Sequence, residues 1–537
     1  MSTLLYLNGN IYTMDAARPR AQAFAIDSAS GRILAVGTND EVRRVGGQHT
    51  ELIDLRGRTV LPGFIDSHIH LLDTAYRAHY IDAGSSTSED EAAQLVRERA
   101  AQTPPDNWIL GGHWDKNLWP GGNFPSKASL DAVAPQHPVA LWSKDGHMLW
   151  VNSLALQRAH ITAETPDPST GAILRDGAGE PTGVLQEEDA TGLVYRVIGP
   201  PNPELNRVLI RRALTSLQKS GITTIHDIEG AASLDIFTEL RASNELGVRV
   251  QMILPRQMLP QLRTEGITND ENDLLRVGGI KIFADGTLGS QTAAMLESFE
   301  GTDNYGILTI PEQEMMDIVS DATEMGLVIA IHAIGDRAAR VALNSIERAQ
   351  QLIAEQGTPE NPASGLRYRL EHVQLIAPED LERMRRLGVI ASIQPFHAVA
   401  DRDIAERYWG KRHRHAFAYR TMQALGIPLA MGSDAPVETF DPLRILYAAT
   451  QRRDANVQRP AWQPDQALPI ADALWGYTLG AAYAGAEEQR KGSLTAGKLG
   501  DAIVLRDDIL NTDQEKMPEN GVQATILGGR IVYGQLP

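Results

Sequence analysis

The feature that most constrains the fold is an alternation of short apolar runs with amphipathic helical stretches between residues 61 and 485. Eight apolar runs occur, at residues 60–65, 222–225, 248–254, 279–283, 327–331, 368–370, 389–393 and 427–431. Helical patterns follow most of them. Strands that alternate with helices are typical of parallel βαβ units. Eight such units predict an α/β fold, a (β/α)8 TIM barrel whose catalytic groups lie where the strands end.

Two further parts flank and interrupt this barrel. Residues 1–60 and 486–537 contain short β patterns separated by Gly, Asn and Asp, which predict one small β-sandwich domain built from both termini. The barrel domain then covers residues 61–485. About 150 residues separate the first barrel strand from the second, too many for one connection, so we expect an inserted subdomain at about 75–215 near the barrel mouth.

Composition excludes several classes of function. The 537-residue chain has a net charge of -18, which argues against nucleic-acid binding as its main role. Cysteine is absent, so thiolate ligands, thiol nucleophiles and disulfides are excluded. The N-terminal residues do not resemble a signal peptide, and no apolar stretch approaches the roughly 20 residues of a membrane span. We therefore expect a cytoplasmic protein that acts on a small molecule, with no membrane or nucleic-acid partner.

Two histidines stand at the end of the first barrel strand, in the segment PGFIDSHIH. Residues i and i+2 of a strand face the same way, so His68 and His70 can reach one cation. The pair alone is a weak signal, because two histidines in a polar pocket would give the same pattern.

Later strands strengthen the metal interpretation. His332 and His372 end two of the apolar runs, Asp434 follows a third, and Lys281 lies inside a fourth. Parallel strands of a barrel bring these positions to one rim, where active sites are built. The recurrence of such residues on five strands predicts a metal-dependent active site rather than isolated structural side chains.

With these residues in place, the sequence resembles those of the amidohydrolase superfamily. Its segments GGIKIFADGTLGSQTA, IAIHAIGD, RLEHVQ and AMGSDAPV look like those of the YtcJ-type amidohydrolase 3 branch, which includes N-substituted formamide deformylase. The resemblance extends over essentially the whole chain, including WDKNLWPGG and SKDGHMLWVNSLAL in the insertion. It is specific for the family and poorly specific for a substrate.

The resemblance implies a role for each matching position. His68 and His70 would bind the more buried divalent metal, and His332 and His372 the more exposed one. Lys281 would bridge the two as a CO2-derived carbamate; the alternative is a salt-bridged Lys281 beside a single metal. The implied cofactor is Zn2+, with Mn or Fe as alternatives, at one or two ions per chain. A homodimer is also expected from the family.

Asp434 is the best candidate for the general acid/base and for a further metal ligand. The alternative for this residue is a helix N-cap before Pro436. With Asp434 in the first role, the chain would hydrolyse a C–N bond, an amide or N-acyl amine of an apolar or aromatic small molecule, by attack of metal-activated hydroxide. Ester, lactone or carbamate hydrolysis on the same site is the runner-up. Ring deamination and a non-catalytic binding scaffold are less favoured.

Five further side chains are candidates for substrate binding: His147, His226, Asp285, Trp114 and Trp150. His147 lies in the insertion and either hydrogen-bonds a substrate carbonyl or serves the folding of the insertion. His226 is favoured as a support rather than a ligand, and Asp285 is expected to shape the loop over the metals. Trp114 and Trp150 line an apolar pocket or belong to the insertion's own core. We assign no role to His397, His413 and His415, because histidines of this kind are more often surface residues.

Overall fold

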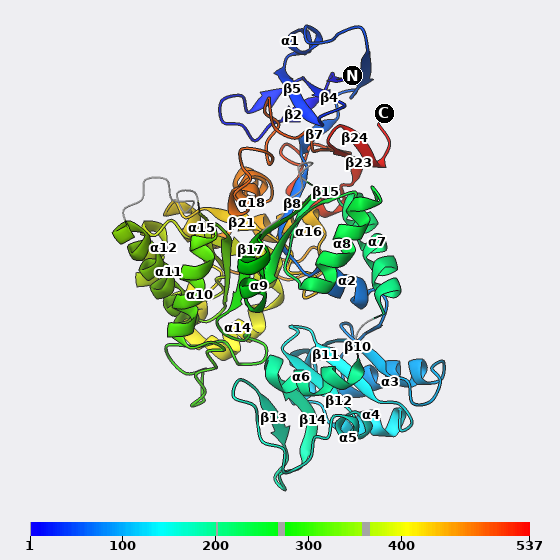
Figure 1. The fold of residues 1–537 in the computed structure, drawn as a ribbon, viewed down its shortest axis with the longest axis vertical. Helices are drawn as coiled ribbons and strands as arrows, with labels where there is room; N and C mark the ends of the chain where they lie inside the picture. Colours follow the sequence, from blue (N-terminus) through cyan, green and yellow to red (C-terminus); the bar gives the residue numbers. More distant parts are fainter. Residues whose placement is uncertain (1, 200–201, 267–273, 357–365, 537) are drawn as a thin grey trace.

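The computed structural model describes residues 2–199, 202–266, 274–356 and 366–536. At its centre lies an eight-stranded parallel sheet, and Figure 1 shows it between two smaller β-rich parts at opposite ends of the molecule. The strands follow one another in chain order: β8(Phe64–Ile69), β15(Ile222–Asp227), β16(Arg249–Pro255), β17(Leu275–Phe283), β18(Val328–Ala333), β19(Tyr368–His372), β20(Ile390–Ile393) and β21(Leu429–Met431). The predicted TIM barrel is confirmed.

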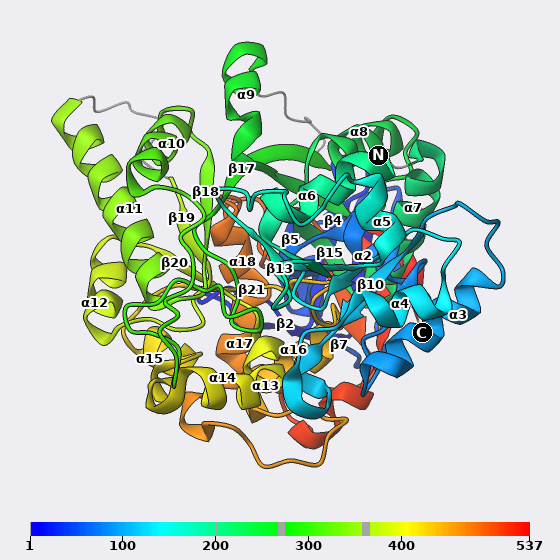
Figure 2. The same ribbon diagram turned by 90° about the horizontal axis from the view of Figure 1, so that it is seen from below.

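Helices on the outside of the barrel follow the strands in the predicted alternation. Figure 2 shows α10, α11 and α12 on one side of the barrel and α7 and α8 on another. The helices are α2(Leu71–Arg77), α7(Pro203–Lys219), α8(Ala231–Ala242), α9(Leu259–Glu265), α10(Glu312–Glu324), α11(Asp336–Gln356), α12(Pro378–Arg386), α13(Pro395–Ala400), α14(Arg402–Trp409), α15(Tyr419–Ala424), α16(Pro442–Gln451), α17(Ile470–Gly476) and α18(Leu479–Ala484). Of the helices in the described ranges, none combines the length and apolarity that a membrane span requires.

The sequence suggested that the first apolar run, residues 60–65, is one strand, but the structure divides it into two. Gly63 divides residues 60–65 between β7(Thr59–Pro62), which pairs in a terminal sheet, and β8 of the barrel. The chain passes so close to β15 that a Cβ on Gly63 would lie 2.1 Å from Oγ1 of Thr223. Glycine therefore permits the direct transfer from the terminal sheet into the barrel.

Strands from both termini form two further sheets, of order β5-β4-β1-β6 and β24-β23-β22-β7-β2-β3. Their strands are β1(Thr3–Leu7), β2(Asn10–Tyr12), β3(Arg20–Ala21), β4(Ala23–Asp27), β5(Arg32–Gly37), β6(Thr50–Asp54), β22(Ala502–Leu505), β23(Val522–Leu527) and β24(Arg530–Gly534), with α1(Asn39–Arg43) beside them. The stacked rings of Tyr6 and Phe24 from one sheet share a buried cluster with Val60 and Val504 from the other. The expected β domain from both termini is thus present.

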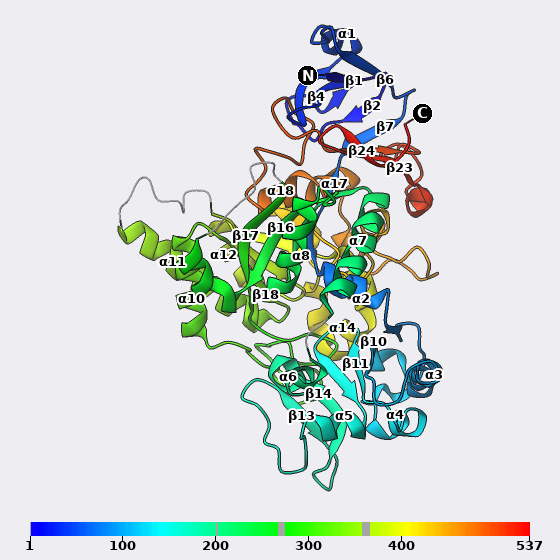
Figure 3. The ribbon, with the colours of Figure 1, turned by 45° about the vertical axis from the view of Figure 1, so that its right-hand side comes forward.

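The insertion carries its own six-stranded sheet of order β13-β14-β12-β11-β10-β9. Figure 3 shows it at the end of the barrel away from the terminal sheets. Its elements are β9(Ile81–Asp82), α3(Glu89–Ala100), β10(Ile109–Trp114), α4(Lys127–Val133), β11(Val139–Ser143), β12(Met148–Val151), α5(Ser153–Arg158), β13(Ala172–Arg175), β14(Pro181–Gln186) and α6(Glu187–Ile198). The turn between β11 and β12 returns to the barrel mouth, where the candidate site lies.

A buried ion pair joins the barrel to the terminal sheets. Arg249 at the start of β16 donates to both carboxylate oxygens of Asp501, from Nε at 2.7 Å and from Nη2 at 2.9 Å. The N–H of Gly528 donates to the same carboxylate at 2.8 Å. Both charged side chains are nearly inaccessible to solvent, so the pair depends on its two-point geometry to offset the cost of dehydration.

We predict that Asp501→Ala lowers the free energy of unfolding by about 3–5 kcal/mol, because a buried guanidinium loses its carboxylate. Thermal denaturation measures this as a fall in melting temperature, with a smaller fall for Asp501→Asn, which keeps one accepting oxygen. Asp507→Ala, at an exposed position nearby, is the control. Equal melting temperatures for Asp501→Ala and the wild type would show that the pair does not stabilise the joint.

Candidate metal centre

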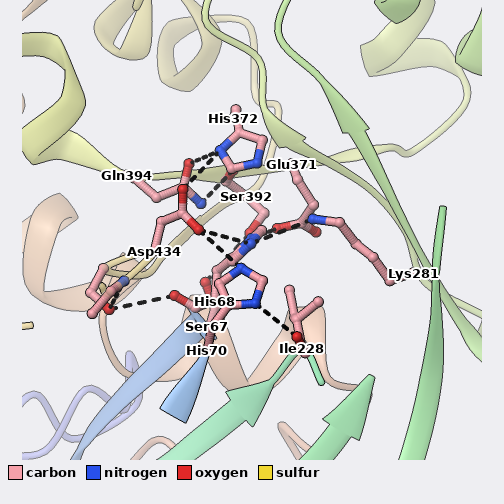
Figure 4. A network of polar contacts seen from close by, with 12 residues as sticks. Ser67, His68, His70, Ile228, Lys281, Glu371, His372, Ser392, Gln394 and Asp434 are labelled. Carbon is pink, nitrogen blue, oxygen red and sulfur yellow. Dashed lines mark hydrogen bonds and ion pairs between the residues drawn. The ribbon is translucent and has the colours of Figure 1, made fainter. Parts of the chain in front are cut away.

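The two histidines of the HIH segment meet the carboxylate of Asp434 at the barrel mouth (Figure 4). Nε2 of His68 and Nε2 of His70 each lie 3.3 Å from Oδ1 of Asp434. One donor atom from each of the three residues lies within 4.8 Å of the others. Two imidazole nitrogens and a carboxylate oxygen at this spacing are a suitable donor set for a divalent cation such as zinc.

The other predicted ligands lie beside this group. Nζ of Lys281 is 3.4 Å from Nε2 of His68. The ring centroid of His372 is 4.9 Å from that of His68 and 4.6 Å from that of His332. The structure therefore brings all six predicted side chains to one rim of the barrel.

His397 also belongs to this group, although the sequence assigned it no role and histidines in such a pattern are more often surface residues. It sits in α13, which begins directly after β20, so its side chain reaches the mouth of the barrel. The buried ring stacks on His372 with centroids 6.0 Å apart, and its Nε2 lies 3.5 Å from Oδ2 of Asp434. Together with His372 and Asp434 it forms a second group of donor atoms within 4.8 Å of one another. The sequence feature that could have indicated this position is a histidine four residues after a buried strand.

Each of the four predicted histidine ligands has its Nδ1 atom against an oxygen acceptor. Nδ1 of His68 contacts Glu371 at 2.5 Å, and that of His70 contacts the carbonyl of Ile228 at 2.8 Å. Nδ1 of His332 contacts Asp285, and that of His372 contacts Oε1 of Gln394, both at 2.9 Å. An acceptor at Nδ1 fixes the hydrogen there and leaves the Nε2 lone pair free for a metal.

Glu371 and Arg369 are site residues that we did not predict. Arg369 donates to Glu371 from Nε at 2.5 Å and from Nη2 at 3.0 Å, and Glu371 in turn holds His68. Burial raises the pKa of Glu371, but the charge of Arg369 and the contact with His68 outweigh it and keep that pKa well below its usual value. The sequence could have revealed them, because two charged residues within one buried strand are as unusual as the lysine at position 281 in another.

Lys281 is buried beside the candidate ligands, between His68 and the ring of Phe283. It is 2% exposed, and its Nζ stands 4.8 Å above the ring of Phe283. In the part of the chain that the structure describes, no carboxylate oxygen lies within 4.0 Å of this nitrogen, so the alternative of a salt-bridged lysine has no partner there. Burial lowers the pKa of Lys281 to about 8.

Asp434 is held in a conformation that local structure does not explain. Its φ of +57° lies in the left-handed region, which non-glycine residues seldom adopt. The N-cap of the following helix α16 is Asp441, so the capping alternative for Asp434 does not apply. Burial raises the pKa of Asp434, but the surrounding histidines, His68 first, outweigh it and hold the pKa well below its usual value.

The turn after β11 crosses the mouth between opposite strands of the barrel. Lys144 pairs with Glu438 in the loop after β21 at 2.6 Å. Asp145 accepts hydrogen bonds of 2.6 Å from both Thr287 and Ser290 in the loop after β17. These two anchors hold the turn across the opening.

His147, at the end of the same turn, faces the centre. Its ring centroid is 5.7 Å from that of His332, and its Nδ1 contacts Glu187 at 2.8 Å. Burial lowers the pKa of His147, but the charge of Glu187 outweighs it and raises the pKa to about 9. The structure therefore brings a charged imidazole from the insertion to the candidate centre.

The other four candidates for substrate binding are placed differently. His226 is fully buried inside the barrel and accepts a hydrogen bond from Nη1 of Arg369 at 3.0 Å. Asp285 is also fully buried, and it holds Nδ1 of His332 and the N–H groups of Ala294, Ile334 and Gly335. Trp114 and Trp150 pack edge to face in the insertion's own core, the second of the two alternatives. Burial of these two tryptophan rings therefore favours the core alternative over the pocket wall.

Comparison with known proteins agrees with this architecture. "Putative amidohydrolase YtcJ" of Bacillus subtilis (strain 168) is 30% identical over 98% of this chain and 99% of its own length. The N-substituted formamide deformylase of Arthrobacter pascens is 28% identical over 99% and 98%. The crystal structure of an uncharacterized metal-dependent hydrolase from Pyrococcus horikoshii OT3 superposes with a TM-score of 0.76 at 26% identity, covering 95% of this chain and 99% of that one.

A family model also matches the chain almost from end to end. The model, described as the amidohydrolase family, matches residues 51–533, a range that includes every residue of the candidate centre. This match confirms the family expected from the sequence: the chain belongs to the amidohydrolase family.

Proposed function

We propose that this protein is a metal-dependent hydrolase that cleaves the C–N bond of an amide or N-acyl amine in a small molecule. The observation that carries the proposal is the set of four histidines whose Nδ1 atoms all meet oxygen acceptors. That arrangement presents four Nε2 lone pairs to one rim of the barrel. The N-substituted formamide deformylase among the relatives supports the choice of a C–N bond.

The chain's own residues fit two divalent cations, and we propose zinc. His68, His70 and Asp434 would hold the first ion, and His332 and His372 the second. Lys281, as a carbamate, would bridge them, because no carboxylate oxygen of the described chain lies within 4.0 Å of its buried amine and carboxylation would give it two anionic oxygens. Bound there, the ions would lower the pKa of a water molecule and polarise the scissile carbonyl.

Asp434 is the proposed general acid/base. Its Oδ1 faces His68 and His70, and its low pKa keeps the carboxylate ionised and able to accept a proton from the attacking water. The water oxygen forms a bond to the carbonyl carbon, the C–N bond breaks, and Asp434 returns the proton to the leaving nitrogen. The products are a carboxylic acid and an amine, with Asp434 restored.

His147 is the proposed donor to the substrate carbonyl. Its pKa of about 9 keeps both ring nitrogens protonated near neutral pH, so Nδ1 donates to Glu187 and the hydrogen at Nε2 is available for an oxygen that gains negative charge in the transition state. The anchors at Lys144 and Asp145 fix the turn that carries it. The insertion would thus contribute a catalytic group and narrow the mouth.

We predict that the metal-loaded wild type contains close to two divalent ions per chain and that Lys281→Ala loses at least one. Metal analysis measures the stoichiometry, and 13C NMR after equilibration with labelled bicarbonate should show a carbamate signal that the variant lacks. Lys219→Ala, at an exposed lysine, is the control. A single ion per chain with full activity in Lys281→Ala would remove the bridge.

Asp434→Asn should keep its metal and lose roughly 10²–10⁴-fold in kcat, because the amide cannot accept the proton of the water. Turnover is to be measured on a screen of N-acyl amines, N-acyl amino acids, formamides and aryl esters. Asp507→Asn serves as the control at an exposed site. Wild-type-like turnover by Asp434→Asn would assign the base elsewhere, and a preference for the esters would contradict the choice of a C–N bond.

His147→Ala should lower kcat by roughly 10²–10³-fold with metal content unchanged, since one donor to the developing oxyanion is lost. The matched control is His160→Ala, at an exposed histidine of the insertion. A rise in KM at constant kcat would instead make His147 a residue of ground-state binding.

A further inference from the structure

His397 differs from the four predicted histidine ligands in the partner of its Nδ1 atom. In those four rings Nδ1 meets an oxygen acceptor. In His397 it meets Nε2 of Gln374, an amide nitrogen, at 3.3 Å. An amide N–H2 group can only donate, so Nδ1 of His397 must accept.

The carboxylate of Asp401 favours this orientation of the Gln374 amide, whose Oε1 meets no donor in the described chain. The same Nε2 lies 3.5 Å from Oδ2 of Asp401, and a carboxylate accepts hydrogen bonds. Turning the amide around would place its oxygen against that carboxylate. Asp401 is itself held close, because its N–H donates to the carbonyl of His397 at 2.8 Å. The hydrogen of the neutral His397 ring therefore resides on Nε2.

This N–H group is buried and points to the candidate centre. Nε2 makes no hydrogen bond within the described chain, and it lies 3.5 Å from Oδ2 of Asp434. Oδ1 of Asp434 faces His68 and His70, whereas Oδ2 faces His397 and, at 3.8 Å, Nδ1 of His372.

We propose that His397 is not a metal ligand but a positioning residue that donates its Nε2–H to Oδ2 of Asp434. The inference rests on the proposed function and adds a group that orients the general acid/base. A nitrogen that carries a hydrogen has no lone pair for a cation, although Nε2 of His397 lies 3.5 Å from Asp434, only slightly farther than those of His68 and His70 at 3.3 Å. The bond restricts rotation of the carboxylate and keeps Oδ1 directed to His68 and His70. Such contacts are often long in unliganded sites and shorten when substrate binds.

Three substitutions separate these roles. His397→Phe keeps a ring against His372 but has no N–H, and His397→Gln restores an amide donor at a similar reach. His397→Ala removes both ring and donor. His415→Phe, at an exposed histidine, is the control. We expect unchanged metal content in all of them, a loss of about 10–100-fold in kcat at constant KM for His397→Phe, and recovery of most of it in His397→Gln.

Two measurements do not depend on turnover. Metal analysis of His397→Ala beside His372→Ala distinguishes a donor from a ligand: only the second variant should lose an ion. In 15N NMR of the histidine-labelled, metal-loaded wild type, the signals absent from His397→Gln should show a ring protonated at Nε2. If the wild type hydrolyses no compound in the screen, the proposed function fails while these two results still test the inference.

Loss of metal in His397→Ala equal to that in His372→Ala would overturn the inference, as would a ring protonated at Nδ1. Full turnover by His397→Phe with its metal retained would also overturn it, because the positioning role would then be absent. Failure of His397→Gln to recover above His397→Phe would show that the N–H group is not the active feature.

Discussion

The hydrogen bond from the N–H of Asp434 to the carbonyl of His68, at 2.7 Å, is the contact on which the centre depends. It joins the chain just after the last barrel strand to the first strand and so closes the rim. Because of it, a histidine near the start of the sequence and an aspartate about 370 residues later share one position in space. The remaining ligands lie on strands between these two, and their placement follows from the closed barrel.

The centre gathers charges that are costly to bury, and the structure offsets that cost within the barrel. Arg369 lies among the barrel strands with no exposed surface, where it binds Glu371, the carbonyl of Ser67 and the hydroxyl of Ser392. Glu371, held in this way, contacts Nδ1 of His68 and so fixes the orientation of that ring. A buried ion pair of this kind is poor evidence of stability and is better explained by the orientation it imposes on a ligand.

The sequence predicted the barrel and the convergence of its polar residues because both depend on period and position. A polar side chain at the end of an apolar run must lie at one rim, whatever the details of packing. The same reasoning gave no role to His397, which a short helix carries to the rim, or to Glu371, which supports a ligand without being one. Tryptophans such as Trp114 and Trp150 are common in pocket walls, and only the packing shows that these two face the core of the insertion. Gly63 likewise has the pattern of a strand residue, and only its close approach to Thr223 shows why the strand is divided at a glycine.

The turn that carries His147 is anchored on both sides of the mouth, at Glu438 and at Thr287 and Ser290. The turn cannot move far alone, because it connects β11 and β12, two strands of a packed sheet. The segment that crosses the mouth therefore belongs to the insertion, whereas the candidate ligands belong to the barrel. Changes in the insertion's sheet could alter which molecules enter while every ligand stayed in place.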